Sequence, residues 1–361
     1  TTPSGAVPVS YNGSYTYELT VGDGYLPGVD MTSAAANGKA ELKQENGAWK
    51  LIVSEVKDNV TITLTDRAIP SNTTVSTDGA GNIVMTLNDA ADMNGNTFTI
   101  TDGEKVTVNM NGKTLSSTDK SVFQVKDGAE LVLTGGGLVT TNKTPVWVDG
   151  ASEVTIDGVN VTTTGEGKAA VLLWKTAANS VINISNSTIT NTSTNGNALA
   201  INGTIGVGTQ LNLDTVTLTN NNGLAVYLAG PATTTMTNCT VTGSTGGVEV
   251  RAGSLILDGG SITSTANSFD ADTFESGGSI ESGAAILVAQ HSTNLAVSAT
   301  TKIGGNATTV TGVIAMANKS DVADVVYNVN IKAAGNGFTV MNQAKTFPMT
   351  INDQTYAAPV A

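Results

Sequence analysis

Ile156-Asp-Gly-Val-Asn-Val161, Ile184-Ser-Asn-Ser-Thr-Ile189 and Leu213-Asp-Thr-Val-Thr-Leu218 share one pattern, and this pattern decides the fold. An apolar residue is followed five positions later by another, with small or polar residues between them. The same spacing recurs in Met110/Leu115, Leu133/Leu138, Met236/Val241, Leu257/Ile262, Val326/Ile331 and Ile351/Tyr356, and with one extra residue in Val297/Ile303. A repeat of roughly 21–29 residues with one longer step is typical of a solenoid, whose neighbouring coils bury each other's apolar residues.

Each coil is predicted to contain three short β-strands. In one coil these are Val122-Phe-Gln-Val125, Glu130-Leu-Val-Leu133 and Leu138-Val-Thr140, separated by glycine-containing turns. Two positions after the first apolar partner stands mostly Gly or Asn, which tolerate the positive φ of a tight bend. We therefore expect a bend column at Gly135, Gly158, Asn186, Asn238 and Asn328. We also expect one buried ladder of Leu133, Ile156, Ile184, Leu213, Met236 and Leu257.

The first part of the chain differs from the rest. Residues 1–67 carry more charge and lack the coil repeat, while Tyr15–Val21, Ala48–Val53 and Val60–Leu64 alternate like half-buried strands. We therefore predict a small β-rich N-terminal module over residues 1–67. A solenoid of about ten coils is expected to follow over 68–361, interrupted by an insertion loop near 265–283.

The repeat resembles the right-handed parallel β-helix, the fold of pectate-lyase-like and bacterial surface proteins. The N-terminal module resembles the β-grasp-like repeats of bacterial cell-surface proteins through Glu55-Val-Lys-Asp-Asn-Val-Thr-Ile-Thr-Leu64. A leucine-rich horseshoe is disfavoured because no half of any repeat has a helical pattern. Together the resemblances imply an exported bacterial protein, either extracellular or on the cell surface. Because the chain starts at Thr1 without an initiator methionine, we interpret it as a trimmed or mature form that has lost a signal peptide.

Composition argues against several kinds of partner. The net charge is −13, and arginine occurs only at Arg67 and Arg251, so neither nucleic acid nor an anionic membrane surface is an expected partner. No stretch approaches the ~20 apolar residues of a membrane span. Cys239 is the single cysteine, which excludes an internal disulfide and a cysteine-based metal cluster. It shares a column of small residues, so we expect a packed and unreactive thiol.

Catalytic candidates are few. The glycosidases of this fold use paired aspartates, because one carboxyl group donates a proton while another acts as base, and no such pair occurs here. The best candidate trio is Glu249 and Arg251, which lie on one face of a strand, with His291 one coil later. A solvated ion pair is the more common explanation for such a Glu and Arg.

Other acidic residues have structural explanations beside the functional ones. Asp157, Asp214 and Asp258 recur one residue into the bend, and we interpret them as turn residues. In the insertion, Asp270, Asp272 and Glu275 could supply oxygen ligands to calcium, although their spacing does not match an EF-hand and a solvated acidic loop is favoured. No other metal or cofactor is expected.

An aromatic stripe is the main binding candidate. If the flanking Val and Leu residues point inward, Trp147 and Tyr227 point outward, and Trp174 belongs to the same face if its strand keeps register. Exposed aromatic rings suit stacking on sugars or contact with protein. We therefore expect a non-catalytic, adhesin-like protein that binds a glycan or a protein along one face. The alternatives are a polysaccharide lyase or glycoside hydrolase, and a phage or fibre component.

Overall fold

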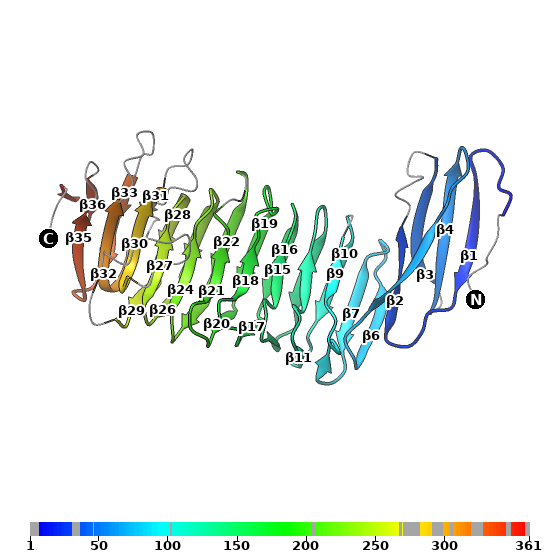
Figure 1. Cartoon of the computed structure of the whole chain (residues 1–361), viewed down its shortest axis with the longest axis horizontal. Coiled ribbons are helices and arrows are strands. Elements are labelled where there is room, and N and C mark those ends of the chain that lie inside the picture. The colour runs from blue at the N-terminus through cyan, green and yellow to red at the C-terminus, as the bar shows by residue number, and fades with distance from the viewer. Residues whose placement is uncertain are drawn as a thin grey trace.

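The protein is built from β-strands throughout the part of the chain that the structure describes. The computed structural model describes residues 7–30, 37–45, 47–101, 103–203, 205, 207–266, 269, 282–290, 299–303, 306–318, 328–343 and 348–357, and every regular element in these ranges is a strand. The strands form a long rod, with the N-terminal strands at one end and the C-terminal coils at the other (Figure 1).

Two small antiparallel sheets form the N-terminal module. One has the order β1 (Gly13–Leu19), β4 (Ala48–Val56), β3 (Lys39–Glu45), and the other pairs β2 (Tyr25–Asp30) with β5 (Thr63–Ala68). Strand β4 alternates as its sequence predicts, burying Trp49, Leu51 and Val53. Leu26 and Trp49 belong to the same apolar cluster as the solenoid core, so the module packs onto the end of the solenoid.

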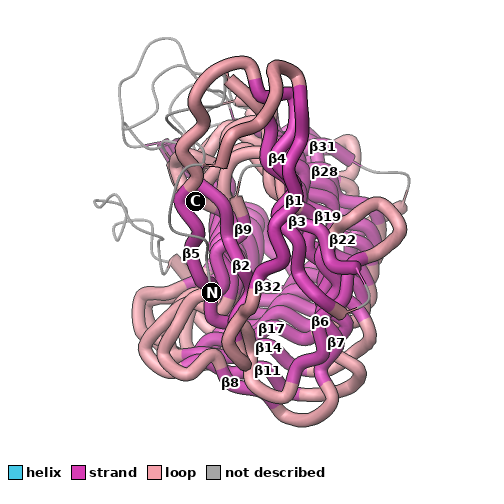
Figure 2. The backbone as a smooth tube through the Cα atoms, turned by 90° about the vertical axis from the view of Figure 1, so that its right-hand side faces the viewer, coloured by secondary structure: helices cyan, strands magenta, loops and turns pink. Residues whose placement is uncertain are grey.

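The rest of the chain is a parallel β-solenoid of about nine turns, close to the ten expected. Figure 2 looks along the rod and shows the strands gathered on separate sides. The first stack of strands begins with the antiparallel pair β6 and β7 and ends with the antiparallel pair β36 and β37. Its members are β6 (Thr73–Thr77), β7 (Ile83–Leu87), β10 (Lys105–Asn109), β13 (Glu130–Thr134), β16 (Glu153–Asp157), β19 (Val181–Ser185), β22 (Gln210–Asp214), β25 (Thr233–Thr237), β28 (Gly253–Asp258), β31 (Ala299–Ile303), β33 (Asn328–Ile331), β36 (Met349–Ile351) and β37 (Gln354–Tyr356).

Two further stacks run beside it and share the long strand β32 (Thr308–Asn318). The second stack holds β8 (Ala91–Asp92), β11 (Thr114–Ser117), β14 (Leu138–Thr141), β17 (Asn160–Thr163), β20 (Thr188–Asn191), β23 (Thr217–Asn220), β26 (Thr240–Gly243), β29 (Ser261–Ser264) and β34 (Ala333–Ala334). The third stack holds β9 (Phe98–Ile100), β12 (Phe123–Val125), β15 (Val146–Val148), β18 (Ala169–Leu173), β21 (Asn197–Ile201), β24 (Leu224–Leu228), β27 (Gly246–Val250), β30 (Ala284–Gln290) and β35 (Phe338–Gln343).

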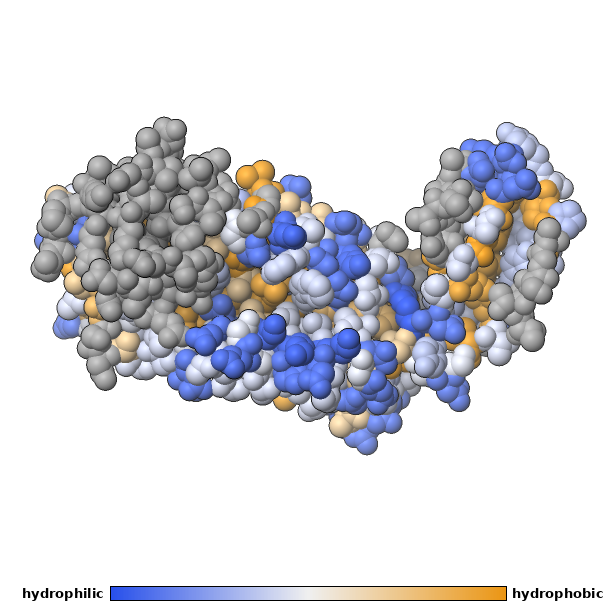
Figure 3. Space-filling model, in the orientation of Figure 1, coloured by the Kyte–Doolittle hydropathy of each residue, from blue (hydrophilic) through white to orange (hydrophobic). Residues whose placement is uncertain are grey.

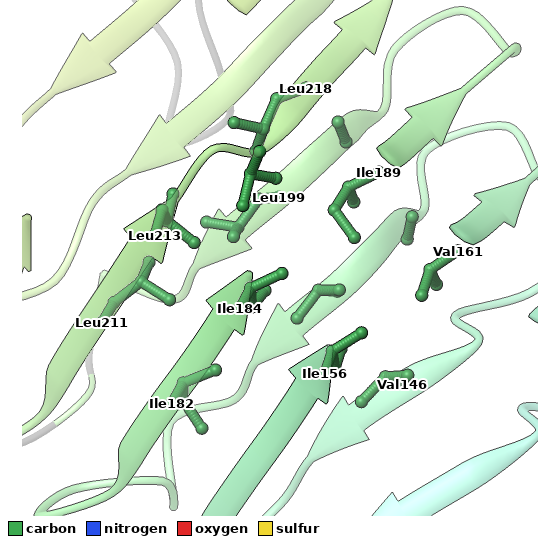
Figure 4. Packing of buried hydrophobic residues seen from close by; sticks show 14 of the residues in the cluster. Val146, Ile156, Val161, Ile182, Ile184, Ile189, Leu199, Leu211, Leu213 and Leu218 are labelled. Carbon is green, nitrogen blue, oxygen red and sulfur yellow. The ribbon is translucent and has the colours of Figure 1, made fainter. Parts of the chain in front are cut away.

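The predicted ladder forms the core. Leu133, Ile156, Ile184, Leu213, Met236 and Leu257 pair in register from coil to coil, and all of them are buried. Figure 4 shows Ile156, Ile184 and Leu213 following one another along the rod, with Val161, Ile189 and Leu218 repeating across the bend. Each fully buried aliphatic side chain contributes about 1.5–3 kcal/mol of apolar transfer free energy, so the stability of the rod is spread over its length.

The bend column is also present, with one exception. Gly135, Gly158, Asn186 and Asn238 have positive φ, and so do Thr215 and Gly259 at the same position of their coils. Asn328 does not belong to the column, because it lies within strand β33. Ile331 pairs with Ile351 in the first stack, so Ile331 is the first partner of a bend and not the second.

Three more of the predicted pairs are corrected by the register. Val139, not Leu138, is buried opposite Leu115 and Val161, because the extra glycine in Gly135–Gly137 delays the strand by one residue. Ile303 pairs with Leu257 and is therefore a first partner. Ile351 and Tyr356 lie on the two strands of the terminal hairpin, and not across a coil bend.

Candidate functional site

The third stack presents one outward-facing column of side chains. Strand pairing places Gln124, Trp147, Leu172, Ala200, Tyr227 and Glu249 side by side on consecutive coils, and we call them the floor column. Trp147 lies between buried Val146 and Val148, and Tyr227 between buried Val226 and Leu228, so both rings face outward as the alternation predicts. Three strand steps separate the two rings, which corresponds to ~14 Å along the rod.

Lysines line one side of the floor column. Lys120, Lys143 and Lys168, which we call the rim lysines, occupy the turns that lead into three consecutive strands of the third stack. The backbone carbonyl of each accepts a hydrogen bond from a buried side chain of the following coil. The donors are Thr141 Oγ1 at 2.6 Å, Thr163 Oγ1 at 2.5 Å and Asn191 Nδ2 at 2.7 Å. The fold therefore fixes the rim lysines in equivalent positions.

The opposite side of the floor column is formed by the residues that follow each strand. Backbone hydrogen bonds place Asp149, Trp174, Asn202, Ala229 and Arg251 in one line there. Trp174 is thus not a member of the outward column, because its strand ends at Leu173 and Leu172 takes the outward position. Trp174 nevertheless lines the same groove as Trp147 and Tyr227.

The middle of the floor column, from Trp147 to Tyr227, and the residues on its two sides line a groove of about 1050 Å³. Figure 3 shows a row of hydrophilic residues along the lower edge of the solenoid, with paler and more hydrophobic surface above it. The groove combines apolar rings with charge, because its lining includes the three rim lysines, Lys175 and Arg251 beside Trp147, Leu172, Trp174 and Tyr227. Such a mixture of flat apolar surface and a few polar groups is typical of ligand sites.

Two ring groups in the groove carry a polar hydrogen. The indole Nε1 of Trp147 is buried and has no acceptor among the described residues. Burial raises the pKa of Tyr227 to about 12, so its phenol stays a neutral hydrogen-bond donor at physiological pH. Arg251 lies over the Tyr227 ring, with Cζ 5.1 Å from the ring centroid.

Glu249 and Arg251 form a buried ion pair. Arg251 Nε donates to Glu249 Oε1, and the two side chains are 3% and 0% exposed. With its carboxylate covered in this way, Glu249 does not present a base to the groove, and the pair supports the ring of Tyr227. His291, the third member of the predicted trio, lies outside the described residues.

The acidic bend residues accept hydrogen bonds at the bends, two of them from other coils. Asp157 Oδ1 accepts from Ser185 Oγ at 2.7 Å and from Asn186 Nδ2 at 3.0 Å, and these bonds hold the pKa of Asp157 below its usual value. Asp258 Oδ1 accepts from Asn306 N at 2.7 Å, and Asp214 Oδ1 accepts from the Thr215 hydroxyl at 2.9 Å. Asp157 and Asp258 therefore connect the bends of different coils, and only Asp214 bonds within its own turn.

Metal-binding candidates stay a prediction. Asp270, Asp272 and Glu275, like most of the insertion, lie outside the described residues. Within the described ranges, no group of three or more His, Cys, Asp or Glu side chains is arranged to hold a metal ion. Cys239 is 3% exposed, and burial raises its pKa to about 11.

The rim lysines were missed by the sequence analysis, although a signal exists. Each stands four residues before a member of the floor column, as Lys120 before Gln124, Lys143 before Trp147 and Lys168 before Leu172. This spacing becomes visible only when the coils are aligned on their outward residues and not on their bends.

Comparison with known proteins adds no family to these observations. Neither the known protein families, nor the curated proteins, nor the solved structures contain a match to this chain. The described residues also include no helix of the length and apolarity needed to cross a membrane.

Proposed function

We propose that this chain is a non-catalytic, adhesin-like surface rod of an exported bacterial protein, and that it binds a glycan in the groove of the third stack. The observation that carries the proposal is the floor column, with two outward aromatic rings three coils apart and Trp174 on the wall between them. Aromatic faces stack on the apolar faces of sugar rings, and a ligand that touches both rings must be extended, as an oligosaccharide is.

The chemistry of the groove supports binding over turnover. General acid–base cleavage of a glycosidic bond needs two positioned carboxyl groups. In the described lining the only acid is Asp119, whose Oδ1 accepts a hydrogen bond from Asn142 Nδ2 at 2.7 Å. The nearby carboxylate of Glu249 is buried against Arg251.

The test begins with a glycan array and calorimetry of the glycans that bind. Trp147→Ala and Tyr227→Ala should each weaken binding about tenfold, which is the loss of one good aromatic contact. Tyr25→Ala is the matched control, because Tyr25 is a 48% exposed ring on the N-terminal module. Unchanged affinity in the double variant Trp147→Ala/Tyr227→Ala would remove this groove as the site. Cleavage of a polysaccharide that disappears in Arg251→Ala would overturn the non-catalytic proposal.

A further inference from the structure

The charge of the groove is opposite in sign to the net charge of the molecule. The chain as a whole carries a net charge of −13, yet five of its 17 Lys and Arg residues line this one groove: Lys120, Lys143, Lys168, Lys175 and Arg251. Arg251 is neutralised by Glu249, and the single acidic residue of the lining is Asp119. The groove is therefore a local cationic surface on an acidic rod.

The rim lysines carry charge that the described protein leaves uncompensated. Lys39, Lys43, Lys50, Arg67, Lys105 and Arg251 all form ion pairs, whereas none of the rim lysines does so with any described residue. Their backbone positions repeat once per coil, at a spacing of ~4.8 Å. Like charges held this close repel one another, and an anion bound along the rim relieves the repulsion.

Resting on the proposed function, we propose that the ligand is a linear anionic glycan lying along the rod axis. Its carboxylate or sulfate groups bind the rim lysines, and its ring faces lie on Trp147, Leu172 and Tyr227. The coil spacing of ~4.8 Å is comparable to the length of one sugar ring, so successive coils can meet successive residues of the polymer. The three rim lysines stand on one side of the floor. Trp174, Lys175 and Arg251 line the other side, where Arg251 is already paired with Glu249.

An acidic peptide fits this groove less well. An extended peptide brings a backbone N–H and C=O at every residue, and these groups need partners when they are buried. The strands of the third stack cannot supply them from the floor, since their backbone groups are already paired with the neighbouring coils. A sugar ring can lay an apolar face on the floor while its hydroxyl and charged groups stay at the ring edge, in solvent or at the rim.

The experiment compares four probes of matched length on the intact protein. These are a hexasaccharide of uronic acid residues, a sulfated hexasaccharide, a neutral cello-hexaose and a hexaglutamate peptide. The variant Lys120→Gln/Lys143→Gln/Lys168→Gln removes the rim charge. The control Lys57→Gln/Lys113→Gln/Lys332→Gln removes the same charge away from the rim. Melting curves confirm that each variant is folded.

The rim variant should bind an anionic hexasaccharide about eightfold more weakly or worse, because three exposed charge pairs each contribute a factor of about two to five. Raising the salt concentration should weaken this binding in the wild type and much less in the rim variant. The control variant should bind as the wild type does. The two anionic sugars distinguish a carboxylated from a sulfated ligand.

Three outcomes would overturn the inference. One is binding of cello-hexaose as tight as that of both anionic sugars, with loss only in Trp147→Ala/Tyr227→Ala. In that case the groove binds a neutral glycan and the proposed function stands. The second is a control variant that weakens binding as much as the rim variant does. The third is preference for hexaglutamate, which would make the ligand an acidic peptide. Failure of every sugar to bind contradicts the proposed function itself.

Discussion

At the scale of single residues, the conformation of most bends can be predicted from the residue type. Gly158, Asn186 and Asn238 were predictable, because Gly and Asn tolerate positive φ and recur between apolar partners. Thr215 occupies the same position with φ of 56°, although a β-branched residue is disfavoured there. Only the spacing of the apolar partners predicted that Thr215 lies in a bend, since threonine itself is typical of a strand. The fold thus imposes a conformation on Thr215 that its side chain opposes.

Replacing Thr215 should therefore stabilise the protein. We expect Thr215→Gly to raise the free energy of unfolding by about 0.5–1 kcal/mol, because the steric cost of the left-handed region that glycine removes exceeds the extra backbone entropy that glycine loses on folding. The lost hydrogen bond to Asp214 is exposed and offsets little of this gain. Thr217→Gly is the matched control: Thr217 lies in strand β23, where glycine is destabilising. A melting temperature that falls in both variants would show that the bend is unstrained.

The single cysteine offers a second test at this scale. We expect Cys239 to react with iodoacetamide at pH 8 far more slowly in the folded protein than in denaturant, because burial blocks access and raises its pKa to about 11. A pKa raised above the unfolded value of 9 contributes stability that is complete below pH 9 and is lost as the pH rises through 11. Cys239→Ala should lack this loss between pH 9 and 11. Equal alkylation rates in the folded and unfolded protein would contradict the placement.

At the scale of strands and turns, the sequence predicted the period of the coil repeat, but it did not always predict the register of the strand after a bend. Ile156, Ile184 and Leu213 entered the core as expected, whereas Leu138 was assigned in place of Val139. The reason is the length of the bend: an extra glycine shifts the strand by one residue, and a shift of one exchanges the two faces. For a related reason, the sequence predicted only part of the groove. Alternation revealed Trp147 and Tyr227, but the rim lysines lie in turns, whose placement depends on how the coils stack.

Each residue of the buried ladder should contribute strongly to the stability of the protein. We expect Leu213→Ala to lower stability by roughly 2–5 kcal/mol, because a fully buried leucine loses its contacts and leaves a cavity. Leu213 is 1% exposed, while its neighbour Asn212 on strand β22 faces solvent, so Asn212→Ala is the matched control. Thermal melting followed by circular dichroism measures both. Equal and small shifts would mean that Leu213 does not lie in the core.

Asn191, a buried residue of strand β20, hydrogen-bonds the backbone of the rim lysine Lys168. Asn191 Nδ2 donates to the carbonyls of Lys168 and Asn197, and Oδ1 accepts from Ser193 N at 2.7 Å. Asn191→Ala removes the partner of Ser193 N and one donor from each carbonyl, although the Lys168 carbonyl keeps its bond from Asn197 N at 3.0 Å. We expect a loss of about 1–3 kcal/mol in stability. If Lys168 binds the ligand, affinity for an anionic hexasaccharide should fall as well. Thr190→Ala, on the outward side of strand β20, should change neither quantity.

At the scale of the whole molecule, both ends of the first stack are closed by antiparallel pairs. Strand β6 pairs with β7 at the N-terminal end, and β37 pairs with β36 at the C-terminal end, which protects edges that this stack would otherwise leave open. The sequence predicted the array and the N-terminal module from their different periodicity. It did not predict how the module and the first coil connect, because that contact depends on residues far apart in the chain.

Arg67 makes that connection, and its removal should uncouple the two parts. From strand β5, Arg67 Nη1 donates to Glu104 Oε2 at 2.7 Å and to the Thr99 carbonyl at 3.0 Å, while its guanidinium lies over the Phe98 ring. We expect Arg67→Ala to lower stability by about 2 kcal/mol, since it breaks part-buried hydrogen bonds to a charged group.

The loss should be confined to the N-terminal end of the rod. A repeat array unfolds from its weakest interface, so calorimetry of Arg67→Ala should show an early transition for the module ahead of the main one. Limited proteolysis should then cut near residues 68–72 while the solenoid core stays intact. Lys39→Ala is the control, because its ion pair with Glu55 is exposed and surface pairs contribute little. A single transition displaced equally in both variants would show that Arg67 does not hold the module to the solenoid.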